Sequence, residues 1–305
     1  MNRRDFSKHF AGAALGAAAL GNRSLLGSAA PPAEGEGPGV PFKLSVMLWT
    51  VFTELPFEAR VAKVAEAGYK NVELVGEYKK WSENDFKTAL AKKHELGLTF
   101  DVTAGLAHGV ADQGARDALL ADVRNELPIM ERLECPAVII MSGNVVPGMS
   151  RQQQHESCVE GLKRAAALVE GKTIAGQPVR LLLENIDPEE NPKYFLQSVA
   201  EGFEVVKTVR HPQVQFLYDF FHEQIAEGNL IEKLEKNIDH VGLVHIADVP
   251  GRHEPGTGEI NYTNIYRKLI QLNYDRYAAM EFVPTSDPVG KLRNAREEVL
   301  AVGRG

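Results

Sequence analysis

The sequence predicts a single-domain α/β protein of the (β/α)8 TIM-barrel class, for three reasons. Short apolar segments alternate with longer amphipathic segments from Pro41 onward. Eight such pairs can be counted, and eight strand–helix units favour closure into a barrel. No low-complexity linker divides them, and a barrel of about 250 residues fits within the 305 residues of the chain.

Eight apolar segments are expected to form the barrel strands. Several of them, such as 138–141 and 181–183, contain no residue suited to an exposed face. Segments that are apolar on both faces are typical of parallel strands covered by helices. The expected strands are residues 43–48, 71–74, 99–102, 137–141, 180–183, 214–217, 241–246 and 277–282.

The intervening segments show helical periodicity. In 57–67, apolar residues such as Val61 and Val64 share one face, and Gly68 follows as a helix stop. Residues 192–209 carry an apolar stripe at spacings of three and four. Two further helix starts are expected near Ser82 and Asn261, whose side chains suit an N-cap.

A doubly wound open sheet is the alternative architecture for alternating strands and helices. It normally places a glycine-rich phosphate loop after the first strand. Residues 48–52 contain no glycine, so the barrel is favoured.

Composition excludes some classes of function. The formal net charge of −7 gives no basic face for nucleic acid, so no nucleic-acid partner is expected. The two cysteines, Cys135 and Cys158, are too few for a disulfide framework.

The first thirty residues are expected to be an export signal and not part of the fold. Arg3 and Arg4 precede a weakly apolar stretch, and small residues follow at 28–30. This order resembles a twin-arginine signal, which implies the twin-arginine export machinery and a periplasmic or otherwise exported protein. An uncleaved membrane tether is the alternative. Residues 31–40 are expected to form a flexible leader, and residues 41–305 the barrel.

Four residues of metal-ligand type lie at the carboxyl ends of four successive late strands. In a barrel these ends converge on one site. Three carboxylates and an imidazole there would repel one another strongly without a cation. We therefore expect a divalent metal ion held by Glu184, Asp219, His245 and Glu281.

The ligand types narrow the identity of the metal. Oxygen-rich ligation with one histidine favours Mn, Mg or Co, with Zn or Fe as alternatives.

Taken alone, each of these residues also has a simpler interpretation that involves no metal. Glu184 and Asp219 would be ordinary loop or turn residues, and His245 a satisfied core histidine.

Residues 248–262 read DVPGRHEPGTGEINY, and this stretch closely resembles the RHEP…GEINY segment of hydroxypyruvate isomerases. Residues 52–57, 65–69 and 72–73 resemble that family's opening strand, helix and second strand. Residues 142–148, SGNVVPG, are similar to its loop after the fourth strand. The resemblance extends from Pro41 to Phe282.

The resemblance implies a xylose-isomerase-like barrel with a divalent ion on the four strand-end residues. It also implies that Glu184 and Glu281 are the catalytic acid–base pair of an isomerase or epimerase. Such a pair would act on a small hydroxy-ketone, hydroxy-keto acid or ketose through an enediolate. His245 departs from the family, which often has Gln at this position, whereas ketose 3-epimerases have His. The exact substrate is therefore left open.

Five further residues are candidates for substrate binding. His222, three residues after Asp219, matches the Asp-x-x-His of the epimerases, where the histidine touches substrate oxygens. A guanidinium suits bidentate contact with a carboxylate, although a loop-stabilising ion pair with Glu254 is the alternative for Arg252. The candidates are Trp49, Glu190, His222, Arg252 and His253.

Two other functions remain as alternatives. A lyase or dehydratase of the same superfamily would eliminate water from a keto-sugar or inosose. An exported sugar-binding protein would use the site without turnover. A phosphodiesterase of the endonuclease IV type would need more histidine ligands and a basic face. The sequence leaves the oligomeric state open, a homo-oligomer included.

Overall fold

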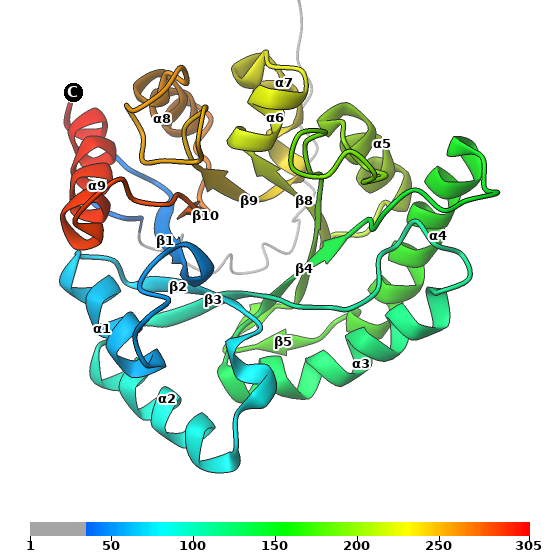
Figure 1. Ribbon diagram of the computed structural model, residues 1–305, viewed down its shortest axis with the longest axis horizontal. Coiled ribbons are helices and arrows are strands. Elements are labelled where there is room, and N and C mark those ends of the chain that lie inside the picture. The colour runs from blue at the N-terminus through cyan, green and yellow to red at the C-terminus, as the bar shows by residue number, and fades with distance from the viewer. Residues whose placement is uncertain (1–34) are drawn as a thin grey trace, which may run out of the picture. The chain divides into compact units, whose positions relative to one another are not determined.

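The computed structural model describes residues 35–305, which form a closed barrel of eight parallel strands ringed by helices (Figure 1). The order around the barrel is β1-β10-β9-β8-β7-β4-β3-β2, so consecutive barrel strands are neighbours. This confirms the predicted (β/α)8 barrel. The barrel strands are β1 (Lys43–Met47), β2 (Asn71–Val75), β3 (Thr99–Ala104), β4 (Ala137–Met141), β7 (Arg180–Glu184), β8 (Val214–Asp219), β9 (Val241–Ile246) and β10 (Tyr277–Met280).

Helices follow the barrel strands and cover their outer faces (Figure 1). A two-stranded hairpin of β5 (Thr173–Ile174) and β6 (Gln177–Pro178) precedes β7. The α-helices are α1 (Phe57–Glu66), α2 (Glu83–Glu95), α3 (Arg116–Leu133), α4 (Arg151–Val169), α5 (Val199–Val209), α6 (Phe220–Ala226), α7 (Leu230–Asn237), α8 (Tyr262–Gln271) and α9 (Pro288–Arg304). The 3-10 helices are η1 (Leu48–Thr50), η2 (Glu77–Lys80) and η3 (Ile238–His240).

The helix boundaries follow from local sequence, with one difference from expectation. Ser82 caps α2 in a capping box, and the Asn261 side chain caps α8, as predicted. The helix expected over 192–209 begins only at Val199. Residues before it contact the loop after β4 instead, since the backbone N–H of Val145 donates a hydrogen bond to the Lys193 oxygen and that of Phe195 donates one to the Gly143 oxygen.

The apolar core has two layers separated by the sheet. A large outer layer fills the space between the strands and the helices. A smaller inner layer fills the barrel, and both cysteines are free and buried outside it. The inner layer consists of Met47, Val102, Ala137, Ile139, Leu182, Leu217, Leu243 and Ala279.

The expected signal at residues 1–30 and the first part of the leader lie outside the described residues. Within the rest of the leader, Val40 is buried, and the Glu36 carboxylate lies 2.8 Å from Arg296 Nε. The barrel's contacts therefore begin before Pro41. In residues 35–305 no helix is both long enough and apolar enough to cross a membrane.

Candidate active site

The alternation of side chains along four strands points four polar residues into the barrel mouth. Successive residues of a strand face opposite sides of the sheet, so positions two apart face the same side. Each of four inner-layer residues is followed two positions later by a polar residue at the strand's carboxyl end. These pairs are Leu182 with Glu184, Leu217 with Asp219, Leu243 with His245 and Ala279 with Glu281.

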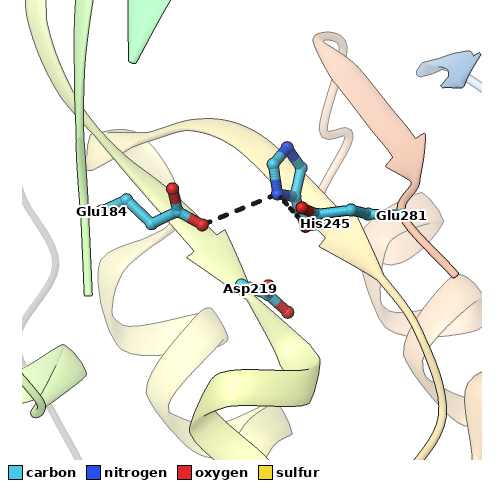
Figure 2. A group of neighbouring side chains, drawn as sticks. All are labelled: Glu184, Asp219, His245 and Glu281. Atoms are coloured by element: carbon cyan, nitrogen blue, oxygen red, sulfur yellow. Dashed lines mark ion pairs between the residues drawn. The ribbon is translucent and has the colours of Figure 1, made fainter. Parts of the chain in front are cut away.

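The four polar side chains meet, as the sequence predicted. One ligand atom from each lies within 4.8 Å of the others, and all four residues are buried. His245 Nδ1 lies 2.6 Å from Glu281 Oε2 and 3.7 Å from Glu184 Oε1. Figure 2 shows the two glutamates on opposite sides of this ring nitrogen, with Asp219 below it.

The donor set fits a divalent cation. His245 Nδ1 and Glu281 Oε2 face each other closely, yet neither makes a hydrogen bond of acceptable geometry to any described residue. Two buried, unsatisfied acceptors that converge on one point are stabilised by a cation between them. Three carboxylates and one imidazole suit Mn, Mg or Co, and also Zn or Fe.

Asp219 is oriented by the helix that it begins. It is the N-cap of α6, and its Oδ1 accepts hydrogen bonds from the backbone N–H groups of Phe221 and His222. Its Oδ2 is left to face Arg252 and the other candidate ligands. One local capping signal therefore also fixes a carboxylate of the site.

Arg252 is the main positive charge beside these carboxylates. Its Nη2 lies 2.7 Å from Glu281 Oε2 and 3.2 Å from Asp219 Oδ2, and its Nη1 lies 2.9 Å from Glu190 Oε1. The guanidinium also stacks over the Phe221 ring, 4.7 Å from its centroid. Arg252 thus joins the expected substrate-binding residue Glu190 to the four candidate ligands.

Asp248 shapes the loop that carries Arg252. This carboxylate is fully buried, and it accepts backbone hydrogen bonds of 2.9–3.0 Å from Gly256, Gly258 and Ile260. Gly258 is required there, since a Cβ would come within 1.9 Å of the backbone oxygen of Val249. The RHEP…GEINY segment is therefore a loop wound around one buried carboxylate.

His222 lies next to the candidate ligands and is held by a residue that the sequence analysis missed. Its Nδ1 lies 2.6 Å from Asp187 Oδ2, and its Nε2 lies 3.4 Å from Asp219 Oδ2. Burial opposes the charged ring, but the charge of Asp219 and the hydrogen bond to Asp187 raise the pKa of His222 to about 9. Asp187 lies three residues after the strand-end Glu184, and this position is the sequence signal that could have indicated it.

Trp49 contacts one of the predicted catalytic residues. Its indole Nε1 donates a 2.7 Å hydrogen bond to Glu281 Oε1, and Arg252 lies over its ring at 5.4 Å. The side chain is also 42% exposed, so it lies at the open edge of the site. Trp49, a predicted substrate-binding residue, is therefore also a hydrogen-bond donor to Glu281.

The remaining loop residues have partners of their own. His253 Nδ1 donates to the backbone oxygen of Val283 at 2.8 Å. Glu254 does not pair with Arg252; its Oε1 lies 2.6 Å from Lys291 Nζ instead. Of the two candidates in this loop, Arg252 is the one placed among the four strand-end side chains.

The two glutamates differ in their electrostatic surroundings. Burial raises the pKa of Glu184 to about 8, and the charge of Glu281 adds to this effect. Burial also opposes ionisation of Glu281, but Arg252 and His245 outweigh it and hold the pKa of that carboxyl well below its usual range. Without a bound cation, these surroundings favour the protonated form of Glu184 and the ionised form of Glu281. Surroundings that give two neighbouring carboxylates very different pKa values are typical of acid–base pairs.

A buried carboxylate beneath the site was also not singled out from the sequence. Glu73 on β2 is fully buried, and its Oε2 lies 3.0 Å from His245 Nε2. The signal was a charged residue inside an otherwise apolar strand, between Val72 and Leu74.

Fold and site together define a barrel with a ring of carboxylates and one histidine at the carboxyl ends of its late strands. Comparison with known proteins identifies the family. Residues 61–301 match the xylose isomerase-like TIM barrel family, and the chain belongs to it.

Relatives and a solved structure agree with this assignment. The chain is 33% identical over 253 residues to a 2-oxo-tetronate isomerase of Haemophilus influenzae, covering 81% of this chain and 95% of that protein. It is 28% identical over 261 residues to the hydroxypyruvate isomerase of Escherichia coli, covering 82% and 97%. A crystal structure described as an AP endonuclease of family 2 from Brucella melitensis matches with a TM-score of 0.74 at 28% identity, covering 82% and 96%.

Proposed function

We propose that the chain is a metal-dependent isomerase that moves a proton between adjacent carbons of a small hydroxy-keto acid or ketose. The observation that carries this proposal is the approach of two glutamates to one buried nitrogen of His245: Glu184 at the end of β7 and Glu281 directly after β10. The names of the relatives, hydroxypyruvate isomerase and 2-oxo-tetronate isomerase, support the same class of reaction.

The proposed proton transfer uses the two glutamates on the two sides of the substrate carbon. A divalent cation on the four side chains would polarise the substrate carbonyl and acidify the neighbouring C–H bond. One carboxylate removes that proton, and the electron pair of the C–H bond moves toward the carbonyl oxygen to give an enediolate. The other glutamate then returns a proton to the adjacent carbon, which was the carbonyl carbon. The hydroxyl proton on the first carbon moves to the former carbonyl oxygen, so a new carbonyl forms at the first carbon and the product is an isomer of the substrate.

The positive groups of the site support a substrate that carries a carboxylate. Arg252 is buried, and although burial opposes it, the acidic neighbours of His222 raise the pKa of that ring to about 9. A planar guanidinium binds a carboxylate in bidentate fashion. We therefore place hydroxypyruvate and 2-oxo-tetronate first among the substrates to test, with ketoses next because of His245.

The test is metal analysis of the purified protein, followed by deuterium wash-in from heavy water. We expect one divalent ion per chain, and deuterium at a carbon next to the carbonyl of at least one of these substrates. Glu184→Gln and Glu281→Gln each remove a proton-transfer group, so the exchange rate is expected to fall by about 10²- to 10⁴-fold. Glu204→Gln, an exposed glutamate of α5, is the control and leaves the rate unchanged.

Three outcomes contradict the proposal. Deuterium exchange with none of the substrates would exclude proton transfer next to a carbonyl. Loss of water from the substrate would indicate a lyase, and tight binding without turnover would indicate a sugar-binding protein.

We also propose that residues 1–30 export the chain through the twin-arginine route, on the strength of Arg3, Arg4 and the weakly apolar stretch after them. Fractionation of cells that express the full chain tests this. We expect periplasmic protein, and cytoplasmic retention when Arg3 and Arg4 are both replaced by Lys. An unchanged location in that double variant would contradict the proposal.

A further inference from the structure

Beneath the four strand-end side chains, the barrel interior holds two more carboxylates. Glu73 on β2 and Asp101 on β3 are at most 1% exposed, and each keeps one oxygen without a hydrogen-bond partner among the described residues. Ser45 Oγ donates a 2.8 Å hydrogen bond to Asp101 Oδ1. Glu73 instead reaches across the barrel to His245, since β2 and β9 are separated by β1 and β10 (Figure 1).

We propose that Glu73 is a positioning residue that fixes the tautomer and orientation of His245, so that Nδ1 is presented to a metal ion. This inference rests on the proposed function, because it assumes that the four strand-end side chains bind a cation. Its basis is one geometry: Glu73 contacts one nitrogen of the ring, and Glu184 and Glu281 lie beside the other.

The hydrogen-bonding capacity of the two partners determines the tautomer. An ionised carboxylate can only accept, so the 3.0 Å contact with Glu73 Oε2 places the proton on His245 Nε2. With a cation bound beside Nδ1, that nitrogen would carry the lone pair of a neutral ring. In Figure 2 the other ring nitrogen points away from Glu184 and Glu281. The 2.6 Å approach of Nδ1 to Glu281 lacks hydrogen-bond geometry, which suits two ligands of one ion.

A role in stability alone does not account for Glu73. An unpaired carboxylate oxygen in a dry interior is destabilising, and an apolar residue of similar volume would often be neutral or stabilising there. The inner faces of the neighbouring strands show that this interior accepts apolar residues, for example Met47 and Val102. A carboxylate that holds the distal nitrogen of a metal-bound histidine is a common arrangement in metal sites.

Asp101 provides a matched control for the test. It is as buried as Glu73 and lies on the next strand, but its hydrogen bond goes to Ser45 and not to His245. Asp101→Asn therefore replaces a buried carboxyl group of the same layer without removing a partner of the ring. Glu73→Gln keeps the shape of the side chain, but its amide can turn an N–H toward Nε2 and favour the other tautomer.

The first measurement is the Mn²⁺ dissociation constant, obtained by competition with a chelator, for wild type and both variants. We expect Glu73→Gln to weaken Mn²⁺ binding by about 10- to 100-fold, as is typical when such a partner is lost. Asp101→Asn is expected to bind Mn²⁺ within about threefold of wild type, since it does not touch a ligand. Circular dichroism melts establish that each variant is folded at the temperature of the measurement.

The second measurement is made on the wild type, and a variant serves only to assign one signal. In ¹⁵N-histidine-labelled wild type loaded with Zn²⁺, with the His245 signal assigned from His245→Gln, we expect a metal-bound Nδ1 and a protonated Nε2. Ligation through Nε2 would overturn the inference. So would equal Mn²⁺ affinity of Glu73→Gln and wild type, or an equal loss of affinity in Asp101→Asn. A wild type that binds no divalent ion would contradict the proposed function itself, and is recognised before any variant is compared.

Discussion

Removing the charge of Arg252 is expected to destabilise the cation-free protein far more than the cation-loaded protein. Arg252 is 7% exposed, and its guanidinium lies within 3.2 Å of the carboxylates of both Glu281 and Asp219. Arg252→Met leaves these two buried groups without their positive partner. A divalent ion bound between them would supply the missing charge.

The structure sets the size of the effect. Removing one partner of a buried ion pair costs about 3–5 kcal/mol, because the remaining charge stays buried and unpaired. With a cation bound, only the net hydrogen bonds of Arg252 are lost, about 1 kcal/mol. By linkage, Arg252→Met is expected to bind Mn²⁺ at least about tenfold more tightly than wild type.

Thermal unfolding in EDTA measures the loss of stability without a cation, and unfolding in saturating Mn²⁺ measures the loss with one bound. We expect Tm to fall by on the order of 10 °C in EDTA and by only a few degrees with Mn²⁺. Arg164→Met is the control, since its ion pair with Glu160 is exposed and contributes about 1 kcal/mol or less. An equal loss of Tm in EDTA and Mn²⁺ would refute the claim that Arg252 and a cation neutralise the same carboxylates.

Three further changes have defined outcomes. Burial opposes ionisation of Glu254, but hydrogen bonds and Lys291 outweigh it and lower the pKa of this carboxyl from 4.5 to about 2. Its ionised form therefore stabilises the fold above pH 4.5, and this contribution is lost as the pH falls to about 2. The difference in unfolding free energy between wild type and Glu254→Gln, from urea titrations, should therefore shrink over that range; a difference that grows there would contradict the assignment. Trp49→Phe removes the hydrogen bond to Glu281 at the edge of the site, so kcat should fall about tenfold while Tm changes little. Gly202→Ala brings a Cβ within 2.2 Å of a buried ring and should cost about 1–3 kcal/mol in chemical unfolding.

The strand and helix boundaries show where local sequence was sufficient. The strands over 137–141 and 241–246 were predicted to the residue, because apolar runs between polar turns have clear ends. The helix over 192–209 was placed too early. An apolar stripe predicts burial, and Phe195 is indeed buried, but its backbone binds the loop after β4.

The candidate site also has a part that the sequence could predict and a part that it could not. The four strand-end residues could be predicted, since a period of two along each strand and the common edge of a parallel barrel are properties of sequence and fold class. The pairing of Arg252 with Glu281 and Asp219 could not, since the alternative partner Glu254 is nearer in the chain. The loop around Asp248 decides which carboxylate the guanidinium meets.

The sequence by itself therefore determined the barrel, its strands and the ring of four polar residues at one rim. Only the tertiary structure decided which groups hold those residues: Glu73 on His245, Asp187 on His222 and Arg252 on Glu281. The physical reason is that hydrophobic periodicity depends on residues only a few positions apart in the chain. The contact between Glu73 and His245, which are 172 residues apart, depends instead on how the strands are staggered when the barrel closes.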